Sequence, residues 1–95
     1  MRIGVVGLGY VGLPLAVAFS EAGHDVVGVD SDMRVVEGLG AGRSHIEDVS
    51  DHVLDGVAER LRTTTRYADL AQTDAVIVAV PTPLAWPDAW PASPW

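Results

Sequence analysis

The chain has 95 residues, of which 48% are hydrophobic, and this is enough for one small domain with its own core. Thirteen acidic residues against six basic ones, all arginine, give a net charge of −7, and no basic stripe runs along the sequence, so nucleic acid is not an expected partner. Cysteine is absent, which excludes disulfides, thiolate zinc sites and a thiol nucleophile.

The N-terminal segment, residues 2–19, has the arginine and the apolar run of a signal peptide. Helix-weakening residues interrupt that run at Gly4, Gly7, Gly9, Gly12 and Pro14. We therefore expect no signal peptide, and no stretch is long or apolar enough to span a membrane. The expected location is the cytoplasm.

The first three elements are predicted to be a strand, a helix and a strand. Residues 2–6 form an apolar run that ends before a glycine, as in a strand buried on both faces. Residues 10–22 predict a helix that ends before Gly23, and residues 25–29 predict a second strand. The inward face of the helix is predicted from the spacing of Val11, Leu15, Ala18, Phe19 and Ala22.

Two further helices are predicted in the middle of the chain. Residues 32–40 predict one helix, and residues 40–48 predict a loop. The next helix is expected to begin with a cap at Ser50 or Asp51 and to continue through Arg62. The inward residues are predicted to be Val35, Val36 and Leu39 in the first helix and Val53, Leu54, Val57, Ala58 and Leu61 in the second.

Two more strands complete the pattern. Residues 63–66 predict a short strand, residues 67–72 one or two helical turns, and residues 74–80 (DAVIVAV) a strand. Strands that alternate with helices imply right-handed crossovers and a parallel sheet. We predict an α/β fold: a partial Rossmann fold with about four parallel strands in the order 3-2-1-4 and flanking helices. The strand at 74–80 then forms a bare apolar edge, from which we expect self-association.

The last eleven residues, AWPDAWPASPW, differ sharply in composition from the rest. They contain all three tryptophans and three of the six prolines, and proline blocks both a helix and a central strand. The sequence is therefore divided into a domain at residues 1–84 and an irregular tail at residues 85–95. The abrupt change favours a truncation or a shifted reading frame over a natural tail with a docking role.

The sequence GLGYVG is a G-x-G-x-x-G pattern between the first strand and the first helix, where dinucleotide-binding folds carry it. Gly7 permits a tight turn, Gly9 lets a pyrophosphate approach the backbone, and Gly12 allows close packing of the helix. The amides of Tyr10 and Val11, at the positive end of the helix, are expected to bind the diphosphate.

An acidic residue, Asp30, closes the second strand. We expect its carboxylate to accept hydrogen bonds from the adenosine ribose hydroxyls. Because the same charge repels a 2′-phosphate, the predicted cofactor is NAD rather than NADP. Arg34 is expected to line the adenosine end of the site. The alternative is a glycine-rich turn of a strand–helix–strand unit that binds nothing.

A second cluster of polar side chains needs a separate interpretation. It consists of His45, Glu47, Asp48, Asp51 and His52. The spacing matches no metal-ligand motif, so we expect a solvated acidic loop and no metal.

Four segments, IGVVGLGYVGLPLA, VGVD, GRSHIEDV and DAVIVAVPTPL, together resemble the N-terminal domain of the UDP-glucose/GDP-mannose dehydrogenase family. The resemblance covers residues 1–84 and is strongest to the branch that acts on UDP-N-acetylhexosamines. It implies that Tyr10, Val11 and Asp30 contact NAD. It also implies that a turn containing Pro81 and Thr82 lies beside the nicotinamide-side ribose or the phosphates. The alternative for Thr82 is a turn hydroxyl that bonds its own backbone.

The resemblance also implies a reaction. Enzymes of this family oxidise the C6 alcohol of a nucleotide sugar to a carboxylate in two NAD-dependent steps, through a thiohemiacetal and a thioester on a cysteine. The family's catalytic cysteine, lysine, asparagine and glutamate lie beyond the point where this chain ends, and the chain has no Cys, Lys or Asn.

The expected function is therefore the NAD-binding portion of a nucleotide-sugar 6-dehydrogenase that serves polysaccharide precursor synthesis. The UDP-sugar, expected to be a UDP-N-acetylhexosamine, would bind only to the full-length parent, and the chain alone is predicted to be inactive. The alternative is a non-catalytic remnant that binds NAD weakly or not at all.

Overall fold

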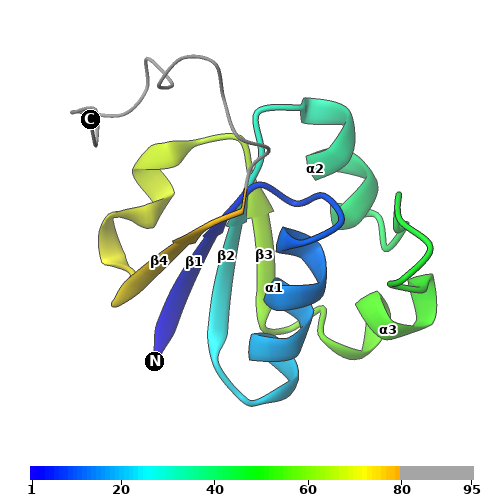
Figure 1. The fold of residues 1–95 in the computed structure, drawn as a ribbon, viewed down its shortest axis with the longest axis horizontal. Helices are drawn as coiled ribbons and strands as arrows, with labels where there is room; N and C mark the ends of the chain where they lie inside the picture. Colours follow the sequence, from blue (N-terminus) through cyan, green and yellow to red (C-terminus); the bar gives the residue numbers. More distant parts are fainter. Residues whose placement is uncertain (80–95) are drawn as a thin grey trace.

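A computed structural model describes residues 1–79 of the chain. They form a parallel four-stranded sheet flanked by helices, so the predicted α/β class is confirmed (Figure 1). In chain order the elements are β1 (Arg2–Val6), α1 (Gly12–Glu21), β2 (Asp25–Val29), α2 (Met33–Gly40), α3 (Asp51–Gly56), β3 (Leu61–Thr64), the 3₁₀ helix η1 (Tyr67–Gln72) and β4 (Ala75–Val78).

The strand order is β3-β2-β1-β4, as predicted. Val6 at the end of β1 pairs with Val29 of β2 and with Val78 of β4, and Val29 pairs with Thr64 of β3. The four strands therefore end in register, and their carboxyl ends lie at one edge of the sheet. In open α/β sheets, ligands bind outside this carboxyl edge where the strand order reverses, which here is between β1 and β4.

The helices divide between the two faces of the sheet. The helices α1, α2 and α3 cover one face, where Ile3 and Val26 enter the core (Figure 1). Gly4, the next residue of β1, faces the other side, because successive strand residues alternate. A Cβ built on Gly4 would lie 2.5 Å from Cδ2 of Leu70, so η1 crosses the second face.

The core lies between the sheet and α1–α3. Its buried members are Ile3, Val5, Leu8, Leu13, Ala16, Val17, Val26, Leu39, Ile46, Val49, Leu54 and Val57. Leu8 is notable because it belongs to the glycine loop yet is fully buried. It packs against Gly28 of β2, where a Cβ would lie 2.8 Å from Cδ2 of Leu8.

The predicted inward face of α1 is wrong. Val11 and Ala18 are exposed, and the buried face consists of Gly12, Leu13, Ala16, Val17 and Ser20. This helix is apolar on most sides, so periodicity fits two faces equally well, and the contact of Gly12 with the preceding turn selects between them. The hydroxyl of Ser20 is satisfied in the core by donating to the carbonyl oxygen of Ala16 at 2.8 Å.

The third helix is shorter than predicted. Ser50 caps it, since its Oγ accepts the amide of Val53 at 3.1 Å, but the helix ends at Gly56 instead of Arg62. Glycine has low helix propensity. The chain then turns, and Leu61 begins β3 by pairing with Val26, two residues before the predicted strand. Of the predicted inward residues in this region, Leu54 and Val57 are buried, whereas Val53 and Ala58 are exposed.

The remaining predictions agree with the structure in part or fall outside it. The strands at residues 2–6 and 25–29 have the predicted bounds, and β4 lies within the predicted 74–80. The proposed boundary between residues 84 and 85 lies outside the described residues and stays a prediction. Among the helices of residues 1–79, none is long and apolar enough to cross a membrane.

Candidate functional site

The glycine loop between β1 and α1 begins with a tight turn at Gly7. Its φ is 93°, in the left-handed region that glycine adopts without the steric cost of a Cβ. The amide of Gly7 donates to the carbonyl oxygen of Val29 at 2.7 Å, so the turn starts against the end of β2. The predicted turn is therefore confirmed.

Gly12 closes the loop as the first residue of α1. A Cβ built on Gly12 would overlap the carbonyl oxygen of Gly7, so a side chain is excluded unless the backbone shifts. The predicted close packing is confirmed, although its main partner is the turn that follows β1 and not a strand.

The backbone amides of the loop form a candidate anion site. Within residues 1–79, the amides of Gly9, Tyr10, Val11 and Gly12 donate no hydrogen bond, whereas the amide of Leu13 donates to the carbonyl oxygen of Gly9 at 3.1 Å. A Cβ built on Gly9 would meet no atom within 4 Å among the non-neighbouring residues that the structure describes, so these residues leave space beside the backbone. Unpaired N–H groups at the positive end of a helix are the groups that bind phosphates in proteins.

Asp30 stands directly beside this loop. Its Oδ2 accepts the amide of Leu8 at 3.0 Å, and its Oδ1 accepts the amide of Asp32 at 2.9 Å. The half-buried carboxylate thus lies at the end of β2, next to the amides that would face a diphosphate. The predicted adjacency of the glycine loop and Asp30 is present in the structure, while the contact with a ribose stays a prediction.

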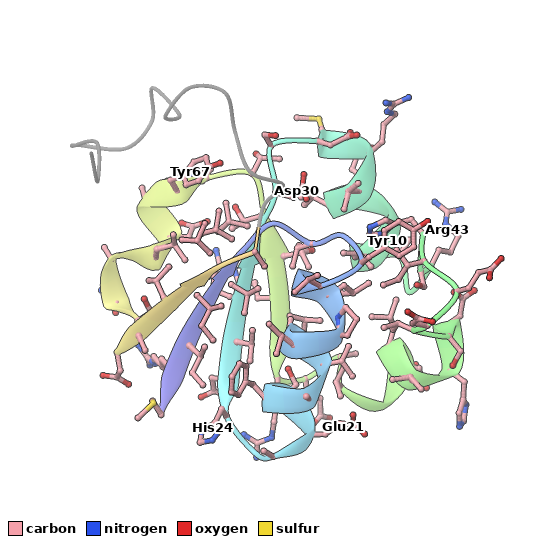
Figure 2. All side chains as sticks on the ribbon, viewed as in Figure 1. Tyr10, Glu21, His24, Asp30, Arg43 and Tyr67 are labelled. Atoms are coloured by element: carbon pink, nitrogen blue, oxygen red, sulfur yellow. The ribbon has the colours of Figure 1, made fainter. Side chains whose placement is uncertain are left out.

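Two of the predicted cofactor-contacting residues present exposed side chains. Tyr10 is 76% exposed and Val11 is 62% exposed, so both are available to a ligand. Figure 2 shows Asp30 and Tyr10 toward one end of the sheet, whereas Glu21 and His24 lie at the opposite end.

Arg34 lies one residue inside α2, close to Asp32. The amide of Arg34 donates to Oδ1 of Asp32 at 2.9 Å, and its Nε lies 3.5 Å from the same oxygen. The backbone hydrogen bond, followed by the side-chain contact, lowers the pKa of Asp32. The Arg34 side chain is 91% exposed, and its predicted place at the adenosine end of a cofactor stays a prediction.

Pro81 and Thr82 lie outside the described residues, so their predicted cofactor contacts stay predictions. The chain leads toward them along β4, and the amide of Ala79 donates to the carbonyl oxygen of Val6 at 2.7 Å. Ala79 therefore lies beside the end of β1.

Among the described residues, the acidic loop around His45 and His52 brings together no group of three His, Cys, Asp or Glu side chains that could hold a metal ion. Its polar groups organise the loop itself. Oδ1 of Asp51 accepts the amide of Ser44 at 2.7 Å, and Ser44 Oγ donates to the carbonyl oxygen of Ile46 at 2.9 Å.

Two hollows lie elsewhere on the part of the molecule that the structure describes. One, of about 340 Å³, has Arg60 on its wall beside Asp25, and Arg60 donates to the carbonyl oxygen of Gly23 at 2.8 Å. Arg62 on the same wall lies 3.7 Å from a carboxylate oxygen of Asp69. The other, of about 520 Å³, lies between α2, α3 and β3. In the first hollow, Arg60 and Arg62 thus each lie beside a carboxylate.

The sequence did not indicate two polar contacts at the carboxyl edge of the sheet. One is the hydrogen bond from the Leu8 amide to the Asp30 carboxylate, which no motif in the sequence predicts. The other joins Thr64, at the end of β3, to Asp69 of η1, with Thr64 Oγ1 donating to Oδ2 at 2.7 Å. A Thr followed five residues later by Asp is too common a pattern to predict it.

The geometry at this edge fits a dinucleotide. Amides that donate no hydrogen bond within residues 1–79 lie beside the Asp30 carboxylate, which is the arrangement expected for a diphosphate and its adjoining sugar. This part of the chain is therefore suited to hold a cofactor.

Comparison with known families matches residues 1–89 to the NAD-binding domain of the UDP-glucose/GDP-mannose dehydrogenase family. UDP-glucose 6-dehydrogenase AglM of Haloferax volcanii is 41% identical over 85 residues, which are 87% of this chain and 20% of the relative. UDP-N-acetyl-D-mannosamine dehydrogenase of Pyrococcus horikoshii is 42% identical over 91 residues, 93% of this chain and 22% of the relative. The chain thus spans about a fifth of the length of these curated relatives.

Solved structures agree with the sequence comparison. The structure of the Pyrococcus horikoshii enzyme superposes with a TM-score of 0.82 at 42% identity and covers 90% of this chain and 21% of its own. A ternary complex of GDP-mannose dehydrogenase from Pseudomonas aeruginosa gives a TM-score of 0.81 at 34% identity, with 87% and 20% covered. This chain belongs to the UDP-glucose/GDP-mannose dehydrogenase family, and residues 1–89 match its NAD-binding domain.

Proposed function

We propose that this chain holds NAD at the carboxyl edge of its sheet, with the diphosphate on the amides of residues 9–12 and the adenosine ribose on Asp30. One observation carries the proposal. The amides that donate no hydrogen bond within residues 1–79 lie at the positive end of α1, beside a carboxylate that is fixed by two backbone amides. Tyr10 and Val11 add exposed side chains on the same loop.

The charge of Asp30 supports a preference for NAD over NADP. A carboxylate accepts hydrogen bonds from ribose hydroxyls and repels a 2′-phosphate. Arg34 is the cation that would oppose this preference, but its side chain points into solvent and lies against Asp32. We therefore assign the preference to Asp30 and a position along the adenosine to Arg34.

The parent enzyme is proposed to oxidise the C6 alcohol of a UDP-sugar, most specifically a UDP-N-acetylhexosamine, to a uronate for polysaccharide precursors. When bound, NAD supplies the acceptor for the hydride removed from carbon. The described residues bind and orient it, and Pro81 and Thr82 are proposed to contact its nicotinamide half. The names of the relatives, which include UDP-glucose and UDP-N-acetyl-D-mannosamine dehydrogenases, support the UDP-sugar class.

The chain by itself is proposed to bind the cofactor without turning over a sugar. Its 95 residues contain no cysteine to carry a thioester, and no lysine or asparagine. The alternative is a remnant that binds NAD weakly or not at all. A spectrophotometric assay of NAD reduction with UDP-sugars tests whether the chain alone is inactive, and any turnover above background contradicts this proposal.

Isothermal titration calorimetry with NAD and NADP tests the proposed site. Wild-type chain is expected to bind NAD more tightly than NADP. In the Asp30→Ala variant, NAD affinity is expected to fall by about tenfold or more, as for the loss of hydrogen bonds to a charged group, and the preference over NADP to decrease. Unchanged affinities for both dinucleotides would remove Asp30 from the site, and no binding of NAD by folded wild-type chain would favour the remnant.

Two further properties are proposed. Location in the cytoplasm is supported by residues 2–19, which form β1, the glycine loop and most of α1, so cleavage there as a signal peptide would remove the centre of the sheet. Self-association through β4 is supported by its place at the edge of the sheet that residues 1–79 form and by the exposure of Val76 and Val78.

A further inference from the structure

We propose that Asp30 is also a positioning residue for the phosphate-binding loop, which its carboxylate holds in shape before any cofactor arrives. In the proposed function, Asp30 binds the adenosine ribose of NAD directly. The additional role concerns binding of the diphosphate of NAD, on which Asp30 acts through the loop and not by direct contact. The consequence of this role for cofactor binding rests on the proposed function. The hydrogen bond from the Leu8 amide to the Asp30 carboxylate, called the brace below, is present in the free protein.

Three hydrogen bonds hold Asp30 in place, two at its carboxylate and one at its backbone amide. Oδ2 accepts the amide of Leu8 at 3.0 Å, and Oδ1 accepts the amide of Asp32 at 2.9 Å. The backbone amide of Asp30 donates to the carbonyl oxygen of Thr64 at 3.1 Å, which anchors the residue to the end of β3. Hydrogen bonds to an ionised acceptor are about twice as strong as neutral ones. The bond to Leu8 is thus a strong link between β2 and the glycine loop.

The fixed position of Leu8 limits the conformations of the glycine loop. Its side chain is fully buried and packs onto Gly28, where a Cβ would lie 2.8 Å from its Cδ2. Its amide is held by Asp30, so both the side chain and the backbone of Leu8 are fixed. Gly7 on one side and Gly9 on the other are the most flexible residues of the loop, and the fixed residue between them limits where the following amides can lie.

The two roles of Asp30 are compatible. An ionised carboxylate offers about four acceptor positions on its two oxygens, and the backbone amides occupy two of them. Positions remain for the ribose hydroxyls. Binding therefore does not require the brace to break, and the loop is organised before the diphosphate arrives, which lowers the entropic cost of binding.

Inorganic pyrophosphate separates the two roles because it has no ribose. If Asp30 only bound the sugar, its removal would leave pyrophosphate affinity unchanged or raise it, since a nearby negative charge would be lost. If Asp30 positions the loop, its removal weakens pyrophosphate binding. The two accounts thus predict different results for the same measurement, since only the positioning role predicts a loss of pyrophosphate affinity.

The experiment uses the 95-residue chain as wild type and as the variants Asp30→Ala, Asp30→Asn and Asp32→Ala. The last is the matched control, because it removes one carboxylate two residues away and leaves both backbone amides that bond Asp30 in place. Pyrophosphate and NAD binding are followed by phosphorus NMR and calorimetry. Hydrogen exchange of the Leu8 amide is measured without ligand.

The expected result is a loss of pyrophosphate affinity of about tenfold in Asp30→Ala, the effect of one charge-assisted hydrogen bond, with little change in Asp32→Ala. The Leu8 amide is expected to exchange about tenfold faster in Asp30→Ala than in wild type. Asp30→Asn retains one acceptor oxygen and serves if the alanine variant does not fold. Its expected losses lie between those of wild type and alanine.

The outcomes separate this inference from the proposed function. Loss of NAD affinity with unchanged pyrophosphate affinity and unchanged Leu8 exchange overturns the brace and leaves the ribose contact standing. Wild-type chain that binds neither ligand contradicts the proposed function, and the Leu8 exchange rates of wild type and variants then decide the brace alone. Equal exchange rates in all folded variants overturn it.

Discussion

Gly12 lies against the carbonyl group of Gly7, so closely that a Cβ on Gly12 would overlap the Gly7 oxygen. The first residue of α1 therefore touches the first residue after β1, and the glycine loop between them is folded back on itself. This contact sets where α1 begins and which of its sides faces the core.

Replacing Gly12 by alanine is expected to destabilise the fold. Inserting a methyl group into a tightly packed site costs about 1–3 kcal/mol, and the group that must move here is backbone. Urea unfolding followed by circular dichroism is expected to show a lower midpoint for Gly12→Ala. An unfolding midpoint equal to that of wild type would show that the backbone at Gly7 moves to accommodate the methyl group without loss of stability.

Gly9→Ala is the matched comparison in the same loop. A Cβ at Gly9 meets nothing within 4 Å, and Gly9 is not among the glycines with positive φ, so stability is expected to stay close to that of wild type. The added methyl group would occupy the space in which a diphosphate approaches the backbone. Calorimetry is expected to show weaker NAD binding with an unchanged unfolding midpoint, and full NAD affinity would place the diphosphate elsewhere.

The buried face of α1 is tested by a pair of leucines. Leu13 is fully buried in the core, whereas Leu15 is only half-buried. Leu13→Ala is expected to lower the free energy of unfolding by about 2–5 kcal/mol, as for other buried leucines. Leu15→Ala is expected to cost clearly less. The reverse order in chemical denaturation would restore the helix face predicted from the sequence.

The cap of α2 gives the protein a pH-dependent contribution to stability. The Arg34 amide lowers the pKa of Asp32, so the ionised cap stabilises the folded state at pH values above the ordinary range of aspartate. That contribution is lost as the pH falls through the lowered pKa. Asp32→Asn keeps a capping oxygen without the charge.

Thermal unfolding of wild type and Asp32→Asn across this acidic range checks the prediction. The stability advantage of wild type is expected at neutral pH and is expected to disappear on acidification. The effect is small, because the cap and the Arg34 side chain are both exposed to solvent. A constant difference between the two proteins at all pH values would contradict it.

The sequence predicted the sheet and the cofactor loop because each depends on local patterns. Short apolar runs ending at glycine or aspartate marked β1 and β2 with the right bounds, and the glycine spacing marked the turn at Gly7. The buried side of α1 was missed because it depends on a contact between Gly7 and Gly12 across the loop. The end of α3 was missed because pairing of Leu61 with Val26 is a long-range interaction. Likewise, no local pattern encodes the bond from Leu8 to Asp30.

The outer edge of β4 should make the chain associate with itself. Val76 and Val78 point to the same side of the strand and are 43% and 47% exposed, and within residues 1–79 β4 is an edge strand that pairs with β1. An apolar edge strand is a template for pairing with another chain, and a lysine on such an edge opposes pairing because its charge would be buried.

Analytical ultracentrifugation tests this interface. Wild type is expected to sediment in a concentration-dependent way, and Val78→Lys is expected to reduce this dependence. The control Val53→Lys, at a 36% exposed position on α3, is expected to keep the wild-type behaviour. Wild-type chain that sediments as a monomer at its highest attainable concentration would rule out this edge as an interface, and equal suppression by both lysines would point to net charge as the cause.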